Sequence, residues 1–322
     1  MHIDEIKALV ADDMARLEHC IMDNSLSSMK IANEIVTHII QSGGKRVRPL
    51  TMMLCAHACG YQGDTHIHVA AVLEYIHTAT LLHDDVIDES RLRRGEATAN
   101  AKFGNAPSVL VGDFLYSRAF ELLVRCEDMR ILASLAQATN IIAQAELLQL
   151  TNRHNTDIKL ETYLEIIQGK TGELFGISGH VAGLLAQLPE NQCQQMRDYG
   201  MHLGMAFQLI DDALDYKADP LQLGKNMGDD LAKGCLTLPL IYALQHGDAE
   251  QVAFIRQCIR EGDINGLKRI QEIIESLEAI TYTIEQAKQQ GQLALEAIAF
   301  LPSSPYKLAL EGLVEFAIAR QH

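Results

Sequence analysis

Two short segments of this sequence carry aspartates at a spacing that could bind divalent cations. Residues 84–88 read Asp-Asp-Val-Ile-Asp, and residues 211–215 read Asp-Asp-Ala-Leu-Asp. On a helix, the first and last aspartates of such a segment share a face, and the second lies about 100° around the axis. Carboxylates this close repel one another, and a hard cation such as Mg²⁺ relieves the repulsion. The spacing therefore predicts metal ligands at Asp84, Asp85 and Asp88, and at Asp211, Asp212 and Asp215.

Positive charges are concentrated close to these acidic segments. Residues 43–49 read Gly-Gly-Lys-Arg-Val-Arg-Pro, and residues 91–95 read Arg-Leu-Arg-Arg-Gly. Lys170-Thr171 lies between two glycines in a helical pattern, and Lys225 lies in a Gly-Lys-Asn turn. Arginine binds phosphate oxygens in a bidentate way, and lysine adds a point charge. A solvated helix end or a solvated turn would explain any one of these clusters, but their combination favours a phosphate-binding site.

The overall composition excludes several classes of partner and location. The formal net charge of −15 argues against nucleic acid as a partner, because a phosphate backbone needs a basic surface. The N-terminus shows no basic stretch followed by an apolar one, and no uninterrupted apolar run approaches the ~20 residues of a membrane span. The seven cysteines are scattered, which favours a reducing, cytoplasmic setting. Cys55 and Cys59 flank His57 at a spacing that could hold a metal, although small buried thiols on a helix explain it better.

The pattern along the chain predicts helices almost throughout. Leucine, alanine, isoleucine and glutamine recur at helical spacing, and few β-branched residues alternate as they do in strands. Thr156 and Asp157 are expected to cap a helix that begins at Ile158. Residues 68–82 and 109–123 are apolar on most of the helix circumference, which favours a central position in a bundle or cover by a partner subunit. Breaks are expected at 42–44, 60–64, 104–107, 153–156, 189–192, 219–234 and 302–305. We therefore expect an all-α protein of ten or more helices, with residues 1–322 forming one domain.

Five motifs in this order resemble the trans-isoprenyl diphosphate synthases. They are Gly-Gly-Lys-Arg-x-Arg-Pro from residue 43, His-Asp-Asp-x-x-Asp from 83 followed by Arg-Arg-Gly, Lys-Thr at 170, Gln-Leu-x-Asp-Asp-x-x-Asp from 208, and Gly-Lys-Asn-x-Gly-Asp-Asp from 224. The resemblance runs from about residue 3 to residue 318, and it is nearest to the long-chain bacterial members, such as those that make octaprenyl diphosphate. It implies an isoprenoid synthase-type helical bundle around a deep central cavity, and a homodimer.

The resemblance also implies a reaction and its residues. Isopentenyl diphosphate would add repeatedly to an allylic diphosphate, expected to be farnesyl diphosphate, to give an octaprenyl (C40) chain for a quinone. Two or three Mg²⁺ ions between the aspartate segments would stabilise the leaving diphosphate, and the allylic cation would then be attacked by the double bond. The implied catalytic residues are Asp84, Asp85, Asp88, Lys170, Asp211 and Asp212. Isopentenyl diphosphate is assigned to Lys45, Arg48, His77 and Arg94, with Phe207 and Gln208 nearby, and the allylic diphosphate to Arg93, Lys170, Thr171 and Lys225.

One position departs from the family pattern. After Gly228-Asp229-Asp230 the family usually has a glycine-lysine pair before a Thr-Leu-Pro stretch. Here residues 233–235 read Lys-Gly-Cys, so Cys235 occupies the position of the usual lysine. Either Lys233 replaces that lysine from a shifted position, or one phosphate contact is missing.

Product length is expected to depend on the small residues before the first acidic segment. In short-chain members, bulky aromatic residues four and five positions before this segment block the product tunnel, whereas this chain has Thr80 and Ala79. Helical phase places Thr80 nearly under Asp84, whereas Ala79 lies on the flank. The alternative, that both are merely small packing residues, stays open. Tyr75 could narrow the tunnel, and Leu123 or Leu135 could form its floor.

Three other functions are compatible with parts of the sequence. A class I terpene cyclase shares one aspartate-rich motif but lacks the Gly-Gly-Lys-Arg-x-Arg site for a second diphosphate. A phosphohydrolase with a His-Asp metal pair could use His83 and Asp84, but it needs further ligands at matching places. A non-catalytic subunit of a heteromeric prenyl synthase usually loses the aspartate-rich motifs, and both are intact here.

Overall fold

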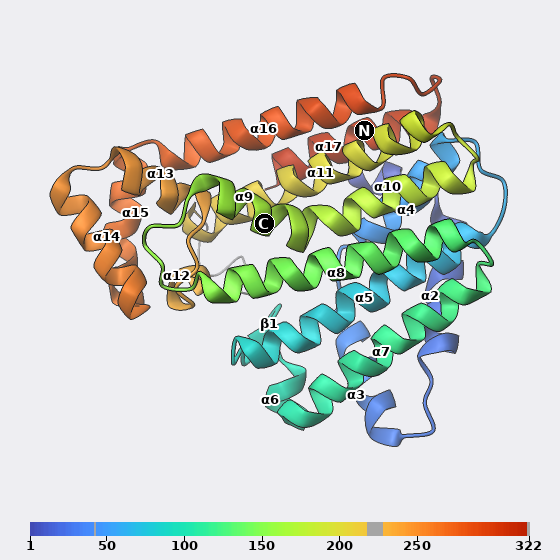
Figure 1. Ribbon diagram of the computed structural model, residues 1–322, viewed down its shortest axis with the longest axis horizontal. Helices are drawn as coiled ribbons and strands as arrows, with labels where there is room; N and C mark the ends of the chain where they lie inside the picture. The colour runs from blue at the N-terminus through green and yellow to red at the C-terminus, as the bar shows by residue number, and fades with distance from the viewer. Residues whose placement is uncertain (42, 218–227, 321–322) are drawn as a thin grey trace. The chain divides into compact units, whose positions relative to one another are not determined.

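The computed structural model describes residues 1–41, 43–217 and 228–320, and these residues are almost entirely helical (Figure 1). The expectation of an all-α protein is therefore confirmed. Residue contacts divide the chain into two compact units. Unit 1 contains Met1–Thr139, Leu174–Gly200 and Ala297–Leu313, and unit 2 contains Asn140–Glu173, Met201–Glu296 and Val314–His322. The expectation that residues 1–322 form one domain stays a prediction.

The elements of unit 1 come mainly from the N-terminal segment Met1–Thr139. They are α1 (Ile3–Ala8), α2 (Ala11–Ser25), α3 (Lys30–Gln41), α4 (Val47–Ala58), α5 (Thr65–Ile87), β1 (Leu92–Arg93), β2 (Glu96–Ala97), α6 (Ala99–Phe103) and α7 (Asn105–Arg125). The unit also contains most of α10 (Glu173–Leu185) and the first parts of α8 (Met129–Thr151), α11 (Glu190–Lys217) and α17 (Pro305–Ala319).

Unit 2 contains the remaining parts of α8, α11 and α17 together with a series of shorter helices. These are α9 (Leu160–Ile167), the π-helical turn η1 (Gln168–Gly172), α12 (Asp229–Ala232), α13 (Leu238–His246), α14 (Ala249–Glu261), the 3₁₀ turn η2 (Ile264–Gly266), α15 (Leu267–Ser276) and α16 (Ala279–Ala297). Their apolar faces share one core, which includes Leu231, Ile255 and Ile270.

Helix α5 is the central helix of unit 1. It packs against α2, α4 and α7, and most of its residues from His66 to Leu82 are buried. The sequence 68–82 is apolar on nearly every side, and a helix of this kind is stable in water only when neighbours cover it. The sequence prediction for this segment is therefore confirmed, and its polar carboxyl-terminal end carries the first acidic segment.

Two helices approach unusually closely in unit 1 because glycine removes the side chain between them. A Cβ atom on Gly200 of α11 would lie 2.0 Å from the carbonyl oxygen of Phe175 in α10, and one on Gly179 would lie 1.9 Å from that of Met196. These distances permit only glycine, so the two helices pack backbone to backbone. Helix α11 then continues to Lys217 and carries the second acidic segment.

Most of the predicted breaks occur, but the predicted helix cap does not. The chain leaves helical structure around 43–46, 60–64, 152–159, 186–189 and 298–304, as expected. Helix α9, however, begins at Leu160, after Lys159. Arg256 takes up both predicted cap residues: it donates to the Thr156 hydroxyl at 3.3 Å and pairs with Asp157 at 2.7 Å. The cap prediction is therefore wrong, because a tertiary contact uses the side chains that a cap would need.

A small hairpin interrupts the helices directly after the first acidic segment. Strands β1 and β2 pair antiparallel, with Arg93 opposite Glu96, and Arg94 and Gly95 form the turn. Both turn residues have positive φ, 54° and 81°, as the tightest hairpin turns require. The sequence interpretation missed this hairpin, because its strands have only two residues each and carry no alternating apolar pattern.

Candidate active site

The first acidic segment lies at the carboxyl-terminal end of α5 in unit 1. Asp84 and Asp88 are half-buried, and Asp88 is the residue at which the helix ends. Asp85 is buried, and the guanidinium group of Arg93 binds it through Nε at 3.1 Å and Nη2 at 2.8 Å. Two half-buried carboxylates one turn apart fit Mg²⁺, which binds one or two carboxylates and keeps several waters. The predicted third ligand, Asp85, is held by an arginine in this structure.

His83 is turned away from a metal role. Its Nε2 atom lies 3.2 Å from the carbonyl oxygen of Val109 and 3.4 Å from the Asp113 carboxylate, both in α7. A Cβ atom on Gly112 would lie 2.3 Å from the same ring, so α7 encloses the imidazole closely. This contact gives His83 a packing role and offers no support for a His-Asp phosphohydrolase site.

The second acidic segment lies in α11 within unit 2, and its first two carboxylates have different environments. Asp211 pairs at 2.9 Å with Arg320, which directly follows α17, and this arginine also lies 3.5 Å above the ring of Phe207. Asp212 is buried and accepts hydrogen bonds from the Tyr163 hydroxyl at 2.5 Å and from Gln208 Nε2 at 2.8 Å. Burial and the nearby charge of Asp230 raise the pKa of Asp212 to about 7.

A chain of hydrogen bonds joins three predicted site residues in unit 2. Thr171 donates to Gln208 Oε1 at 2.8 Å, and Gln208 donates onward to Asp212. Burial and the Asp212 charge raise the pKa of Tyr163 far above its usual value, so its hydroxyl stays protonated as the second donor. The Asp212 carboxylate therefore has a fixed orientation. This orientation also fits a metal ligand, since ordered neighbours are typical of such carboxylates.

Cys235, which occupies the position of the usual lysine of the family, lines a small cavity in unit 2. A small cavity of ≈ 50 Å³ is lined by Gln208, Asp212, Asp230, Cys235 and neighbouring residues. Cys235 is buried there, with its backbone N–H donating to the Asp230 carbonyl at 2.8 Å. A lysine at this position would start its side chain beside two carboxylates. Lys233 is not among the described residues that line this cavity. The idea that Lys233 replaces the usual lysine of the family therefore stays a prediction.

Lys170 and Thr171 lie in a π-helical turn, Gln168–Gly172, between α9 and α10. Such turns widen a helix locally and are common at functional sites. Gly169 permits the turn to approach α8, because a Cβ atom there would lie 2.6 Å from that of Ala145. The Lys170 ammonium group donates to Glu146 at 2.7 Å and to Gln149 at 2.9 Å, both on α8. Lys170 is therefore held in a defined position within unit 2.

The cationic residues of unit 1 gather around His77. Arg48 Nη1 lies 3.2 Å from His77 Nε2, and a Cβ atom on Gly44 would lie 3.1 Å from Arg94 Nη1. Burial, followed by the charges of Arg48, Arg93 and Arg94, lowers the pKa of His77 well below its usual value. The imidazole is therefore neutral, and it accepts from Arg48 rather than adding charge. Lys45 is exposed in the same loop.

Arg46 differs from the other arginines of this cluster. It forms ion pairs with the buried Glu74 of α5 and, at 3.2 Å, with Glu18 of α2. Its φ of 52° and the φ of 54° at Arg94 are left-handed, a conformation that costs non-glycine residues about 1 kcal/mol or more. The Arg46 ion pairs hold one of these strained loops in place. The sequence offered no signal that separates this anchoring arginine from Arg48 beside it.

The residues assigned to product length lie four and five residues, just over one helical turn, before the first acidic segment on α5. Ala79 is fully buried, and Thr80 is half-buried with its hydroxyl donating to the His77 carbonyl at 2.8 Å. The Tyr75 hydroxyl donates to the carbonyl oxygen of Ile21 at 2.6 Å, so this side chain is anchored on α2. Leu123 and Leu135 are buried. The roles of these residues in product length stay predictions, as does the deep cavity.

The structure thus groups the predicted site residues within each unit. In unit 1 it brings together Arg48, His77, Arg93, Arg94 and the segment 84–88, and in unit 2 it joins Thr171, Gln208 and Asp212, while Asp211 pairs with Arg320. Lys225 lies outside the described residues. The sequence interpretation missed Tyr163 and Arg320, because a lone tyrosine in an apolar helix and an arginine near the end of the chain carry no motif.

The chain is similar over almost its whole length to known polyprenyl synthases. The polyprenyl synthetase family model matches residues 29–277. The chain is 44% identical to the octaprenyl diphosphate synthase of Escherichia coli and 43% identical to an all-trans-nonaprenyl-diphosphate synthase (geranyl-diphosphate specific) of Rhodobacter capsulatus. The alignments cover 99% of both chains in the first case, and 98% of this chain and 97% of the relative in the second. A crystal structure of polyprenyl synthase from Caulobacter crescentus, complexed with calcium and isoprenyl diphosphate, matches 100% of this chain and 98% of its own, with a TM-score of 0.96 and 41% identity.

Proposed function

This chain belongs to the polyprenyl synthetase family and is a prenyltransferase that elongates long all-trans chains, and we propose that its reaction depends on Mg²⁺ held by the two acidic segments. The assignment rests above all on two intact Asp-Asp-x-x-Asp segments in a chain that aligns over almost its whole length with octaprenyl diphosphate synthase. The calcium and isoprenyl diphosphate bound by the Caulobacter relative support a divalent cation and a diphosphate as ligands. Both intact segments also argue against a non-catalytic subunit and a terpene cyclase.

The proposed metal ligands are Asp84, Asp85 and Asp88 in unit 1, and Asp211, Asp212 and Asp215 in unit 2. Mg²⁺ bound there would neutralise the diphosphate leaving group, so that the allylic carbon–oxygen bond can ionise. Asp85 and Asp211 each pair with an arginine in this structure, and these arginines would be released toward phosphate oxygens when their carboxylates bind metal. Asp212 needs no such exchange, because its two hydrogen-bond donors are neutral.

The two substrates are assigned to separate sets of residues. Isopentenyl diphosphate would bind Lys45, Arg48 and Arg94, with neutral His77 orienting Arg48. Phe207 and Gln208 would lie near the isopentenyl diphosphate, and the allylic diphosphate would bind Arg93, Lys170 and Thr171. Lys225 belongs to the proposed allylic set through its motif alone.

We propose octaprenyl diphosphate (C40) as the product, with farnesyl diphosphate as the primer. Identity over the whole chain does not separate C40 from C45, since the octaprenyl and nonaprenyl relatives differ by only one percentage point. The proposal rests on the small Ala79 and Thr80 at the head of the proposed tunnel, together with the octaprenyl relative. A quinone side chain would be the destination of such a product.

A homodimer is proposed from the outer face of α8. By length and composition alone this helix could cross a membrane, yet only 28% of its most apolar stretch is buried within the chain. One stripe, spaced every three to four residues, is exposed and uncharged: Ala133, Ala136, Asn140, Ala143, Leu147 and Leu150. A seam with this period is typical of helices that pack against a partner helix. Sedimentation tests this: wild type should sediment as a dimer, and Leu147→Glu, which places a charge in the stripe, as a monomer. Leu308→Glu changes an exposed leucine of α17 and is the control that should remain a dimer.

We further propose that residues 1–322 form a single domain and that the protein is located in the cytoplasm. All seven cysteines are free, which suits a reducing compartment.

Removal of metal by EDTA tests the proposed dependence on Mg²⁺: activity should vanish and return when Mg²⁺ is added, while the circular dichroism spectrum stays unchanged. Full activity in EDTA would contradict it.

A further inference from the structure

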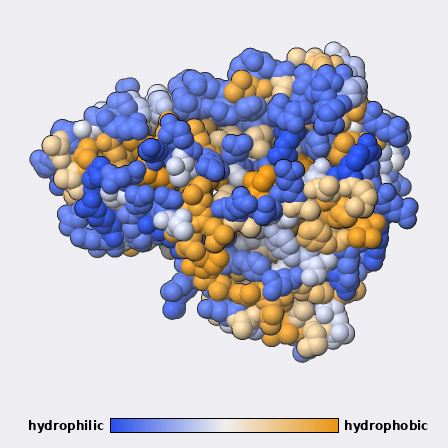
Figure 2. Space-filling view, viewed as in Figure 1, coloured by the Kyte–Doolittle hydropathy of each residue, from blue (hydrophilic) through white to orange (hydrophobic). Residues whose placement is uncertain are grey.

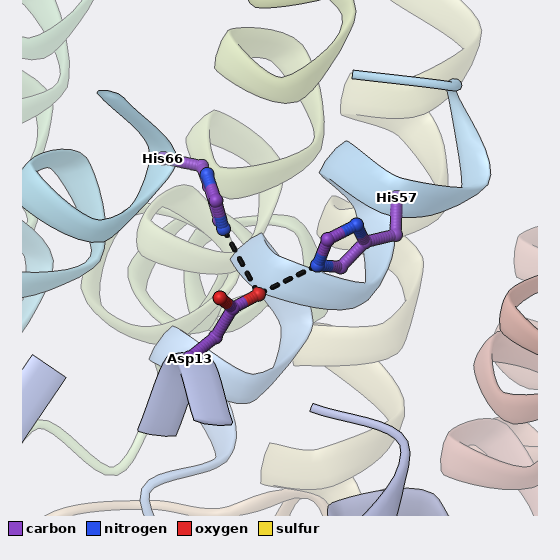
Figure 3. Close-up of side chains that lie close together, drawn as sticks. All are labelled: Asp13, His57 and His66. Carbon is purple, nitrogen blue, oxygen red and sulfur yellow. Dashed lines mark hydrogen bonds and ion pairs between the residues drawn. The ribbon is translucent and has the colours of Figure 1, made fainter. Parts of the chain in front are cut away.

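Three side chains from three helices of unit 1, none of them part of an acidic segment, lie close together (Figure 3). They are Asp13 in α2, His57 in α4 and His66 in α5, and one ligand atom from each lies within 4.8 Å of the other two. His57 is the residue between Cys55 and Cys59 in the sequence. Burial raises the pKa of both thiols, to about 12 at Cys59, so these cysteines are the inert buried kind, and His57 faces Asp13 instead.

The two imidazole rings meet the same carboxylate oxygen. His57 Nε2 lies 2.6 Å and His66 Nε2 3.0 Å from Asp13 Oδ2. The other oxygen, Oδ1, lies 3.7 Å from Arg16, whose stronger partner is Asp64 at 2.8 Å. The Nε2 atoms of His57 and His66 thus both face Oδ2 of Asp13, and the three atoms lie around one small space. A cation with bonds of about 2.0–2.2 Å to each atom would need these distances to open by less than about 1 Å.

The rings are held rigidly by aromatic neighbours. His57 stacks on Tyr306, with centroids 4.7 Å apart and planes at 21°, and His66 meets Tyr61 edge to face at 5.7 Å. His66 is 2% exposed and Asp13 is 9% exposed, so water competes weakly for their ligand atoms. Within the described part of the chain the buried Nδ1 of His66 has no hydrogen-bond partner, so Nε2 alone fixes this ring through a hydrogen bond. Buried, oriented ligands of this kind lose little freedom when a cation binds.

We propose that Asp13, His57 and His66 bind a divalent transition cation, with Zn²⁺ as the best match, and that this cation links α2, α4 and α5. Two imidazoles and a carboxylate are ligands that Zn²⁺ accepts, and three protein ligands leave a fourth position for water. Mg²⁺ prefers sites made of oxygen alone, so the acidic segments and this cluster select different metals. Binding replaces the proton on each Nε2 that now faces Oδ2: in a neutral ring this proton is transferred to Nδ1, and a doubly protonated ring releases one proton to solvent.

Equilibrium dialysis against Zn²⁺ in saturating Mg²⁺ tests the proposal. Wild type should bind one Zn²⁺ per chain that Mg²⁺ does not displace. His57→Gln, which removes one ligand and retains a polar side chain, should weaken this binding at least tenfold. The matched control is His19→Gln, since His19 is exposed on α2 and contacts only the Ala15 carbonyl among the hydrogen bonds described for it. This control should bind Zn²⁺ as wild type does.

Thermal unfolding provides the second measurement. Zn²⁺ at about 100 times its dissociation constant should raise the melting temperature of wild type by roughly 3–5 °C, and that of His57→Gln by much less. Circular dichroism shows whether each variant folds, and Asp13→Asn replaces His57→Gln in both measurements if the latter does not. Equal Zn²⁺ affinity in wild type and the ligand variant would overturn the proposal. So would a wild type that binds no Zn²⁺ in the presence of Mg²⁺.

Discussion

The Tyr163 hydroxyl donates a hydrogen bond of 2.5 Å to the buried carboxylate of Asp212. Gln208 donates to the other oxygen of that carboxylate, and Thr171 in turn donates to Gln208. Two ordered neutral donors fix the direction of this carboxylate without pairing it with a positive charge. Tyr163 therefore connects the core of unit 2 to a proposed Mg²⁺ ligand, and it acts by positioning that ligand.

Tyr163→Phe should weaken Mg²⁺ binding while the protein stays folded. The ring keeps its packing, but Asp212 loses the hydrogen bond that lowers its pKa, so Mg²⁺ must compete with a more tightly held proton. Loss of a partner of this kind typically costs 10–100-fold in metal affinity. The Mg²⁺ concentration for half-maximal rate should rise accordingly, and less so at pH 9 than at pH 7. Tyr242→Phe, outside this network, is the control; an unchanged Mg²⁺ requirement for Tyr163→Phe would refute the positioning role.

Asp212 should also make the stability of the metal-free protein depend on pH. Its pKa is about 7 when folded, against about 3.9 unfolded, so the stabilisation it provides at low pH is lost as the pH rises through 7. Asp212→Asn has no such titration. Its stability relative to wild type should therefore improve by roughly 2–3 kcal/mol between pH 5 and pH 8. Urea unfolding in EDTA measures this, with Asp198→Asn of α11 as the control, and a difference independent of pH would count against the buried carboxylate.

Substitutions of Arg46 and Arg94, which lie in the same cationic cluster, should have different effects: the first should lower stability and the second should weaken substrate binding. Arg46→Gln leaves the buried Glu74 without its ion pair and should cost about 2–4 kcal/mol in unfolding free energy. Arg94→Gln should keep most of the stability but raise the KM for isopentenyl diphosphate roughly 10–100-fold, as expected when a charged hydrogen bond to phosphate is lost. Urea unfolding and steady-state kinetics on both variants check this. The reverse pattern would show that the two arginines have been assigned the wrong way round.

Larger side chains at the proposed head of the tunnel should shorten the product. Ala79→Tyr and Thr80→Phe place an aromatic ring just over one turn before Asp84, where it would obstruct the growing chain. Thr80→Val keeps the volume and should leave the product unchanged. Reversed-phase chromatography of the dephosphorylated products gives the chain length. An unchanged length in both aromatic variants, with elongation intact, would exclude these positions from length control.

The sequence was sufficient for features that repeat locally. The apolar circumference of residues 68–82 and the aspartate spacing at 84–88 follow from helical periodicity, and α5 has both. The ends of helices were predictable where glycine or proline marks them. The end of α7 was not, because Glu127 takes the left-handed conformation there without being glycine. The surrounding structure decides such positions, and a local pattern does not contain it.

Contacts between residues far apart in the chain could not be predicted either, because a local sequence pattern does not contain them. Asp13 is 44 residues from His57 and 53 from His66, and no spacing rule joins them. The pairing of Arg93 with Asp85 depends on a hairpin whose strands are too short to leave a pattern. The motifs identified which residues matter, whereas the partners that orient them required the folded chain.

Elongation by the purified protein tests the central claim most directly. Incubation with farnesyl diphosphate, excess isopentenyl diphosphate and Mg²⁺ should give an all-trans polyprenyl diphosphate, with C40 as the main product. Asp84→Asn and Asp211→Asn should each reduce this elongation by orders of magnitude. Folded wild-type protein that forms no elongated product under these conditions would contradict the account.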